Sequence, residues 1–96
     1  MTEAQIEKKL VAFCREHGLL TYKFASPSHR GVPDRIIMGG AKVMFLELKR
    51  GGQRPTAFQF RELARIQSAG LVATWACTYY DAEKIVREFF YLVKGL

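Results

Sequence analysis

Residues 31–49 read GVPDRIIMGGAKVMFLELK and carry most of the information about the fold. The runs 34–38 and 41–49 are rich in Ile, Val, Met and Phe, a composition typical of β-strands. The two glycines between them, Gly39 and Gly40, are typical of a tight two-residue turn. This stretch therefore predicts a β-hairpin that begins just after Pro33 and ends at Lys49.

On the N-terminal side of the hairpin, the sequence predicts one helix followed by one strand. Thr2 with Gln5 three residues later matches a capping box, and apolar residues at helical spacing follow. Gly18 supplies a left-handed end to that helix. Residues 19–24 are aromatic and apolar enough for a strand, and residues 25–31 have the composition of a loop.

On the C-terminal side, the sequence predicts a helix, a strand and a last helix. Thr56 begins a helix that ends at Gly70, with Phe60 and Ala64 on its inward side. Residues 71–78 are almost wholly apolar, which suits a strand covered on both faces, and Asp81 caps the last helix. The predicted order is α-β-β-β-α-β-α, an α/β fold with a central mixed sheet flanked by helices in a single domain, residues 1–96.

The net charge of the chain points to a nucleic acid as its partner. Fifteen Lys and Arg against nine Asp and Glu give a formal charge of +6 and a pI near 9.6, a balance that attracts a polyanion. No signal peptide or membrane-spanning run is visible, so we expect a cytoplasmic protein with no membrane partner. Cys14 and Cys77 lack the spacing of a disulfide framework or a zinc site.

Two carboxylates within the hairpin are expected to lie close together. Glu47 follows a run of apolar residues, and the hairpin brings Asp34 near it across the two strands. Like charges in such a place repel, which makes sense if a divalent cation lies between them. The alternative is a structural ion pair between Glu47 and Lys49, two residues along the same strand.

These residues resemble a known family of nucleases. Pro33-Asp34, followed after twelve residues by Glu47-Leu48-Lys49, is the PD-(D/E)XK signature. Together with Glu7, Gly31 and Gln59, the sequence is similar to the virus-type replication-repair nuclease (VRR-NUC) domain of stand-alone phage and prophage proteins. The resemblance implies a restriction-endonuclease-like PD-(D/E)XK core.

The resemblance also implies roles for individual residues. Asp34 and Glu47 would bind Mg²⁺ or Mn²⁺ with the backbone carbonyl of Leu48, Lys49 would position or deprotonate the attacking water, and no small-molecule cofactor is implied. Glu7 would be an outer metal ligand; the alternative is that it is one of three solvated glutamates of its helix. Gln59 would orient Lys49 or the water, but a capping box with Thr56 explains it equally well.

Basic residues outside this cluster are candidates for contacts with DNA phosphates, and a solvated surface is the alternative for each of them. His29 has no partner visible in the sequence, so we do not expect it to act as a base. The candidate DNA-binding residues are Lys23, Arg30, Arg35, Arg50, Arg54, Arg61 and Arg65.

The resulting functional hypothesis is a Mg²⁺ or Mn²⁺-dependent DNA endonuclease of the bacterial host cytoplasm. The resemblance implies a substrate of branched DNA, such as a four-way Holliday junction, and a homodimer or higher homo-oligomer as the working form. The aromatic stretch 89–93 is the candidate interface. The alternatives are a non-catalytic nucleic-acid-binding module and a nuclease of the same fold with a restriction-type or RNA substrate.

Overall fold

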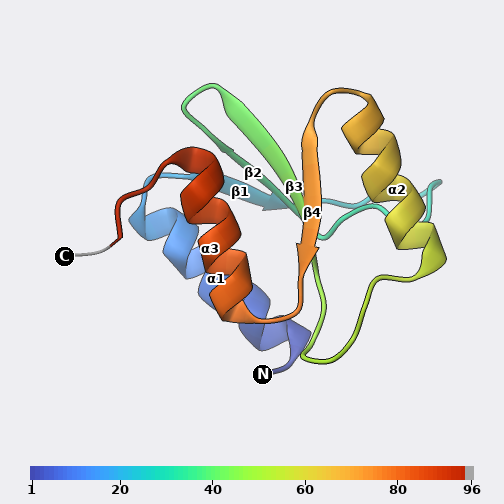
Figure 1. Ribbon diagram of the computed structural model, residues 1–96, viewed down its shortest axis with the longest axis horizontal. Coiled ribbons are helices and arrows are strands. Elements are labelled where there is room, and N and C mark those ends of the chain that lie inside the picture. Colours follow the sequence, from blue (N-terminus) through green and yellow to red (C-terminus); the bar gives the residue numbers. More distant parts are fainter. Residues whose placement is uncertain (95–96) are drawn as a thin grey trace.

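The computed structural model describes residues 1–94 and has the predicted order of elements (Figure 1). Gly95 and Leu96, which the predicted domain includes, lie outside the described residues. None of the helices in the described part of the chain has the length and apolarity needed to cross a membrane. The elements are α1 (Glu3–Glu16), β1 (Leu20–Lys23), β2 (Arg35–Gly39), β3 (Lys42–Leu48), α2 (Ala57–Ser68), β4 (Val72–Ala76) and α3 (Tyr79–Phe90).

The strands form one mixed sheet in the order β1-β2-β3-β4. β1 and β2 are antiparallel, as are β2 and β3, whereas β3 and β4 are parallel. A parallel neighbour cannot be reached through a tight turn, and the connection from β3 to β4 accordingly runs through α2. The mixed sheet that the sequence predicts is therefore confirmed.

The hydrophobic core lies between the sheet and helices α1 and α3 (Figure 1). In β3, the alternation of side chains sends Met44, Leu46 and Leu48 into this core, where each is at most 1% exposed. Glu47 must then point to the opposite face, the side on which α2 packs against β4. The pleat of β3 thus separates the apolar core from the polar site.

The hairpin turn lies one residue further along the chain than predicted. Gly39 is the last residue of β2 and pairs with Lys42, so the turn is made by Gly40 and Ala41, whose φ angles are +54° and +63°. Positive φ at both central residues gives the turn the twist that a β-hairpin needs. Gly39 instead packs closely on Leu19, just before β1, because a Cβ there would lie 2.5 Å from Leu19 Cδ2 and would make that side chain shift.

This shift of the turn sets the register of the two acidic residues. In the observed pairing Arg35 lies opposite Leu46, and continuing the register by one residue puts Asp34 opposite Glu47. A turn at Gly39-Gly40 would instead have put Asp34 opposite Phe45. The corrected turn is thus the one that brings the two carboxylates face to face.

Three further details differ from the prediction. The last helix is capped by Thr78, whose hydroxyl accepts a hydrogen bond from the Asp81 N–H, while Asp81 itself lies in the first turn, where its negative charge favours the helix dipole. β4 is an edge strand and Val72 is exposed, so it is not covered on both faces. Phe60 and Ala64 of α2, predicted to face inward, are also exposed.

Candidate active site

Asp34 is fixed at the end of β3 by its own side chain and backbone. Its Oδ2 atom accepts a hydrogen bond of 2.8 Å from the Leu48 N–H, and its carbonyl accepts one of 2.8 Å from the Phe24 N–H. The two bonds tie the segment after Pro33 both to β3 and to the end of β1. The Asp34 carboxylate is therefore held next to the Glu47-Leu48-Lys49 segment.

Glu47 is a buried carboxylate with one oxygen in use and one without a partner. Its Oε2 atom accepts a 2.9 Å hydrogen bond from the Gln59 amide, and the Lys49 ammonium lies 3.6 Å from the same oxygen. Within residues 1–94, the buried Oε1 atom has no hydrogen-bond partner. Leaving a buried charged oxygen unpaired is costly, so Oε1 is the position at which a cation would fit.

The electrostatics of the two carboxylates favour a cation between them. Burial, and then the negative charge of Asp34, raise the pKa of Glu47 from 4.5 to about 7, although Lys49 opposes this shift. Burial also raises the pKa of Asp34, with a further contribution from Glu7, while the Leu48 N–H lowers it. Both groups thus resist ionisation unless a positive charge is close by.

Gln59 serves the helix and the site at the same time. Its side-chain oxygen accepts a 2.9 Å hydrogen bond from the Thr56 N–H, which completes the capping box of α2, and its Nε2 atom donates to Glu47. The two interpretations that the sequence leaves open are therefore compatible. The contact is with Glu47 rather than with Lys49, so Gln59 orients the carboxylate.

A matched pair of substitutions separates these two roles of Gln59. Gln5 occupies the same position in the capping box of α1, where it bonds only Thr2. Gln5→Ala and Gln59→Ala should each cost about 1 kcal/mol of stability, because each removes the hydrogen bond from the cap residue's N–H while the threonine cap remains. Only Gln59→Ala should also lower kcat, by roughly tenfold or more, because it frees the Glu47 carboxylate. Chemical denaturation and single-turnover cleavage measure the two effects, and equal kcat values for the two variants would refute the role in orienting Glu47.

Glu7 and Arg35 form a pair beside the site. Arg35 Nη1 donates to Glu7 Oε2 at 3.1 Å and its guanidinium also bonds the Thr21 hydroxyl. Arg35 is only 8% exposed, so it does not fit the expectation of a surface phosphate contact. The reason is its side-chain direction: Arg35 lies opposite Leu46 and shares its face of the sheet, toward α1.

Glu7 lies near enough to raise the pKa of Asp34, but it is engaged by Arg35. Across the described residues, no three His, Cys, Asp or Glu side chains gather into a group that could hold a metal. The site therefore offers two carboxylates, Asp34 and Glu47. Such a set is compatible with Mg²⁺, which usually keeps several waters.

A second polar contact near the site joins His29 of the loop before β2 to Glu62 of α2. His29 Nε2 bonds the Glu62 carboxylate of α2, which is only 9% exposed. The lack of a partner for His29, assumed from the sequence, is thus wrong. The available signal was weak: Glu62 follows Gln59 by three residues and therefore lies on a neighbouring part of the same helix face.

The remaining basic candidates are on the surface. Arg65 also lies 3.7 Å from Glu62, but two thirds of its side chain is exposed. Because exposed cations are free to meet phosphates, the structure leaves this group as candidates for DNA contacts. The exposed residues are Lys23, Arg30, Arg50, Arg54, Arg61 and Arg65.

Known structures share this fold. Two solved VRR_NUC domains superpose on the chain with TM-scores of 0.83 and 0.77, at 21% and 17% identity, over 93% and 98% of this chain and 99% and 92% of theirs. Hjc, a Holliday junction resolvase from Archaeoglobus fulgidus, gives a TM-score of 0.60 at 17% identity over 78% of this chain and 67% of its own. The fold, with its PD and ExK residues brought together at one end of β3, is that of a PD-(D/E)XK nuclease.

The sequence comparison narrows this class to a family. The chain matches no family model. It is 46% identical over 69 residues to a protein of Acyrthosiphon pisum secondary endosymbiont phage 1 named "Putative nuclease p44", covering 71% of this chain and 74% of that protein. With the structural neighbours, this relationship shows that the chain belongs to the virus-type replication-repair nuclease (VRR-NUC) family.

Proposed function

We propose that the protein is a Mg²⁺ or Mn²⁺-dependent DNA endonuclease that hydrolyses phosphodiester bonds. The observation that carries the proposal is the unpartnered Oε1 atom of the buried Glu47, beside the carboxylate of Asp34 and the ammonium of Lys49. A purely structural ion pair would not require a second acidic group next to Glu47. The phage nuclease relative supports the same activity.

The residues present fit a divalent cation. Asp34, Glu47 and the backbone carbonyl of Leu48 would hold it, since carboxylate and carbonyl oxygens are the ligands that hard cations prefer. When bound, the ion would lower the pKa of a water molecule and offset negative charge on the scissile phosphate.

The protein side chains supply orientation and charge. Lys49, largely buried and 3.6 Å from Glu47, positions the attacking water and places a positive charge where the phosphate becomes more negative in the transition state. Gln59 holds one oxygen of Glu47 and leaves the other free. The Leu48 N–H holds Asp34 in the same way, so both carboxylates are preorganised.

The substrate we propose is branched DNA, such as a four-way junction, cut by a homodimer in the cytoplasm of a bacterial host. Hjc, which shares the fold, is named as a Holliday junction resolvase. Two active sites related by a two-fold axis can cut opposing strands of a junction, whereas a single site can only nick. Exposed cations from two subunits would also provide a longer track for the DNA backbone.

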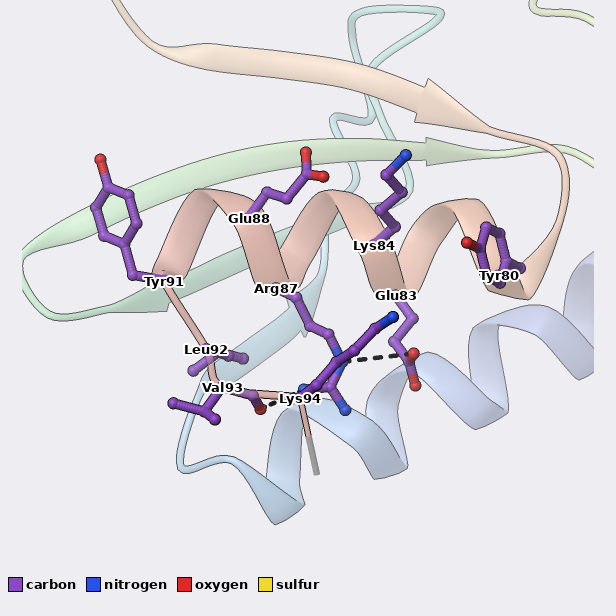
Figure 2. A pocket seen from close by; sticks show the side chains of 9 residues that line it. All are labelled: Tyr80, Glu83, Lys84, Arg87, Glu88, Tyr91, Leu92, Val93 and Lys94. Carbon is purple, nitrogen blue, oxygen red and sulfur yellow. Dashed lines mark hydrogen bonds and ion pairs between the residues drawn. The ribbon is translucent and has the colours of Figure 1, made fainter. Parts of the chain in front are cut away.

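The candidate dimer interface is smaller than the stretch 89–93 suggests. Phe89, Phe90 and Leu92 pack against the core, and only Tyr91 and Val93 are largely exposed. These two side chains lie at one end of a groove between α3 and the segment that follows it (Figure 2). Tyr80, on α3, is a third large exposed side chain of this groove and, with Tyr91, its second exposed aromatic residue. We propose the groove as the contact between the two copies.

Incubation with labelled linear, nicked, flapped and four-way DNA tests this function. Cleavage should require Mg²⁺ or Mn²⁺, stop with EDTA and be fastest on branched DNA. Light scattering with and without a junction should give the mass of a dimer. A strictly monomeric particle that cuts linear duplex as readily as junctions would refute the dimer and the branched substrate. Absence of cleavage under every condition would favour a binding module.

A further inference from the structure

Phe58 is an exposed aromatic residue with two arginines close to its ring. It lies in the first turn of α2 and is 51% exposed. The guanidinium carbons of Arg30 and Arg61 lie 5.2 and 5.3 Å from its ring centroid. An exposed aromatic ring with two cations beside it is well suited to stacking on another flat aromatic group, such as a nucleic-acid base.

The loop that carries Arg30 is fixed against α2 on both sides of that residue. His29 bonds Glu62 one turn along the helix. Gly31 packs so closely on the start of α2 that a Cβ there would lie 2.9 Å from the Phe58 carbonyl oxygen. Arg30 is thus held over the Phe58 ring by the structure of the loop.

A second aromatic group of the same kind lies on the other side of Gln59. Phe60 packs edge to face on Trp75 of β4, with their ring centroids 6.1 Å apart. The guanidinium carbon of Arg54 lies 5.7 Å from the centroid of Phe60 and 6.0 Å from that of Trp75. Phe60 remains 36% exposed.

Consecutive residues of a helix point about 100° apart, so Phe58 and Phe60 diverge on the two sides of Gln59. Because Gln59 bonds Glu47, the two exposed rings flank the buried carboxylate of the candidate active site. Each ring carries at least one arginine able to reach a phosphate.

We propose that unpaired DNA bases next to the scissile phosphate stack on Phe58 and Phe60 while the neighbouring arginines bind the flanking phosphates. This inference rests on the proposed nuclease function and refines its substrate: DNA whose bases are unstacked at the cleavage point. Intact duplex keeps its bases paired and offers no ring to these side chains. The surface therefore distinguishes branches and flaps from continuous duplex.

The charge of the surface favours nucleic acid over a second protein copy as its occupant. Arg30, Arg54 and Arg61 surround the two rings. A two-fold contact through this face would bring equal sets of arginines together, and such like-charge contacts are unfavourable. DNA instead supplies both the flat bases and the negative charge.

The test compares Phe58→Leu with Phe58→Tyr, which keeps an aromatic ring, and with Leu71→Ala as a control. Leu71 is a 44% exposed apolar residue that directly precedes β4, at the end of that strand away from Glu47. Dissociation constants for a flapped duplex and a blunt duplex of equal length are measured by fluorescence anisotropy in EDTA, which prevents hydrolysis. Phe58→Leu should weaken flap binding about tenfold, the value of one stacked base, and leave duplex binding unchanged. Phe58→Tyr and Leu71→Ala should match the wild type.

Two outcomes would overturn the stacking proposal: equal loss of affinity for both DNAs, or no loss for either. If Phe58→Leu keeps its DNA affinity but light scattering shows that it has changed from dimer to monomer, the surface serves self-association. Glu47→Gln, measured in parallel, separates this proposal from the nuclease function. Glu47→Gln should bind the flap like the wild type in EDTA but fail to cleave it with Mg²⁺. If Phe58→Leu weakens flap binding as expected but the wild type cleaves no DNA, only the nuclease function is refuted.

Discussion

Glu47→Gln should abolish DNA cleavage and, in the absence of divalent cations, raise the melting temperature by several degrees at pH 8. The substitution removes a buried negative charge beside Asp34 but keeps an oxygen that can accept the Gln59 hydrogen bond. Removing one of two like charges that repel each other in a buried place should stabilise the metal-free protein, while it also removes a carboxylate needed for activity. Thermal unfolding in EDTA and a cleavage assay with Mg²⁺ measure the two effects.

The pH dependence of the wild type follows from the same group. The folded protein binds the Glu47 proton more tightly than the unfolded chain, because folding raises that pKa from 4.5 to about 7. Stability of the metal-free protein should therefore fall as the pH rises from 4.5 to 7, by on the order of 3 kcal/mol from this carboxyl, and level off above 7.

Glu47→Gln should lack that pH-dependent loss, since its amide does not titrate. Melting curves in EDTA at intervals between pH 5 and pH 8 compare the two proteins. The gap between them should widen as the pH rises. A Glu47→Gln variant that melts below the wild type at pH 8 would show that the carboxylate stabilises the metal-free fold and is not strained.

Alanine substitution of Asp34, Glu47 or Lys49 should each reduce cleavage to background. The three side chains act on one phosphate, and residues that act as a unit are not additive. The triple substitution should consequently be scarcely slower than the most damaging single one. Initial rates on the best branched substrate measure the effect, with the exposed Glu16→Ala as the control that should cleave normally. Any of the three variants with wild-type turnover would remove that residue from the catalytic unit.

The sequence predicts the part of this fold that depends on local patterns. The capping boxes at Thr2 and Thr56 and the left-handed end at Gly18 are local interactions, and all three are confirmed. The hairpin was also predictable, because its strands and glycines are adjacent in the chain. Its exact turn was not, since Ala41 adopts a positive φ that alanine rarely adopts, while Gly39 belongs to β2 and not to the turn.

The contacts that build the site are long-range, and residue type alone does not reveal them. Arg35 was expected at the surface, but its place opposite Leu46 turns it toward Glu7 of α1. The Gln59 side chain completes the capping box of α2 and also bonds Glu47, and it reaches Glu47 only because α2 packs against β4, the strand next to β3. The proposed stacking role of the exposed Phe58 likewise depends on a long-range contact, because Arg30 reaches its ring from a loop that is distant in the sequence.

Calorimetric titration tests whether Asp34 and Glu47 hold a divalent cation. Mg²⁺ and Mn²⁺ are titrated into the wild type, Asp34→Asn and Glu47→Gln, each with and without branched DNA. Binding to the wild type should be clear, should raise its melting temperature with increasing metal concentration, and should be lost or greatly weakened in both variants. Absence of metal binding to the wild type even with DNA, or equal binding to all three proteins, would show that Asp34 and Glu47 do not hold the cation.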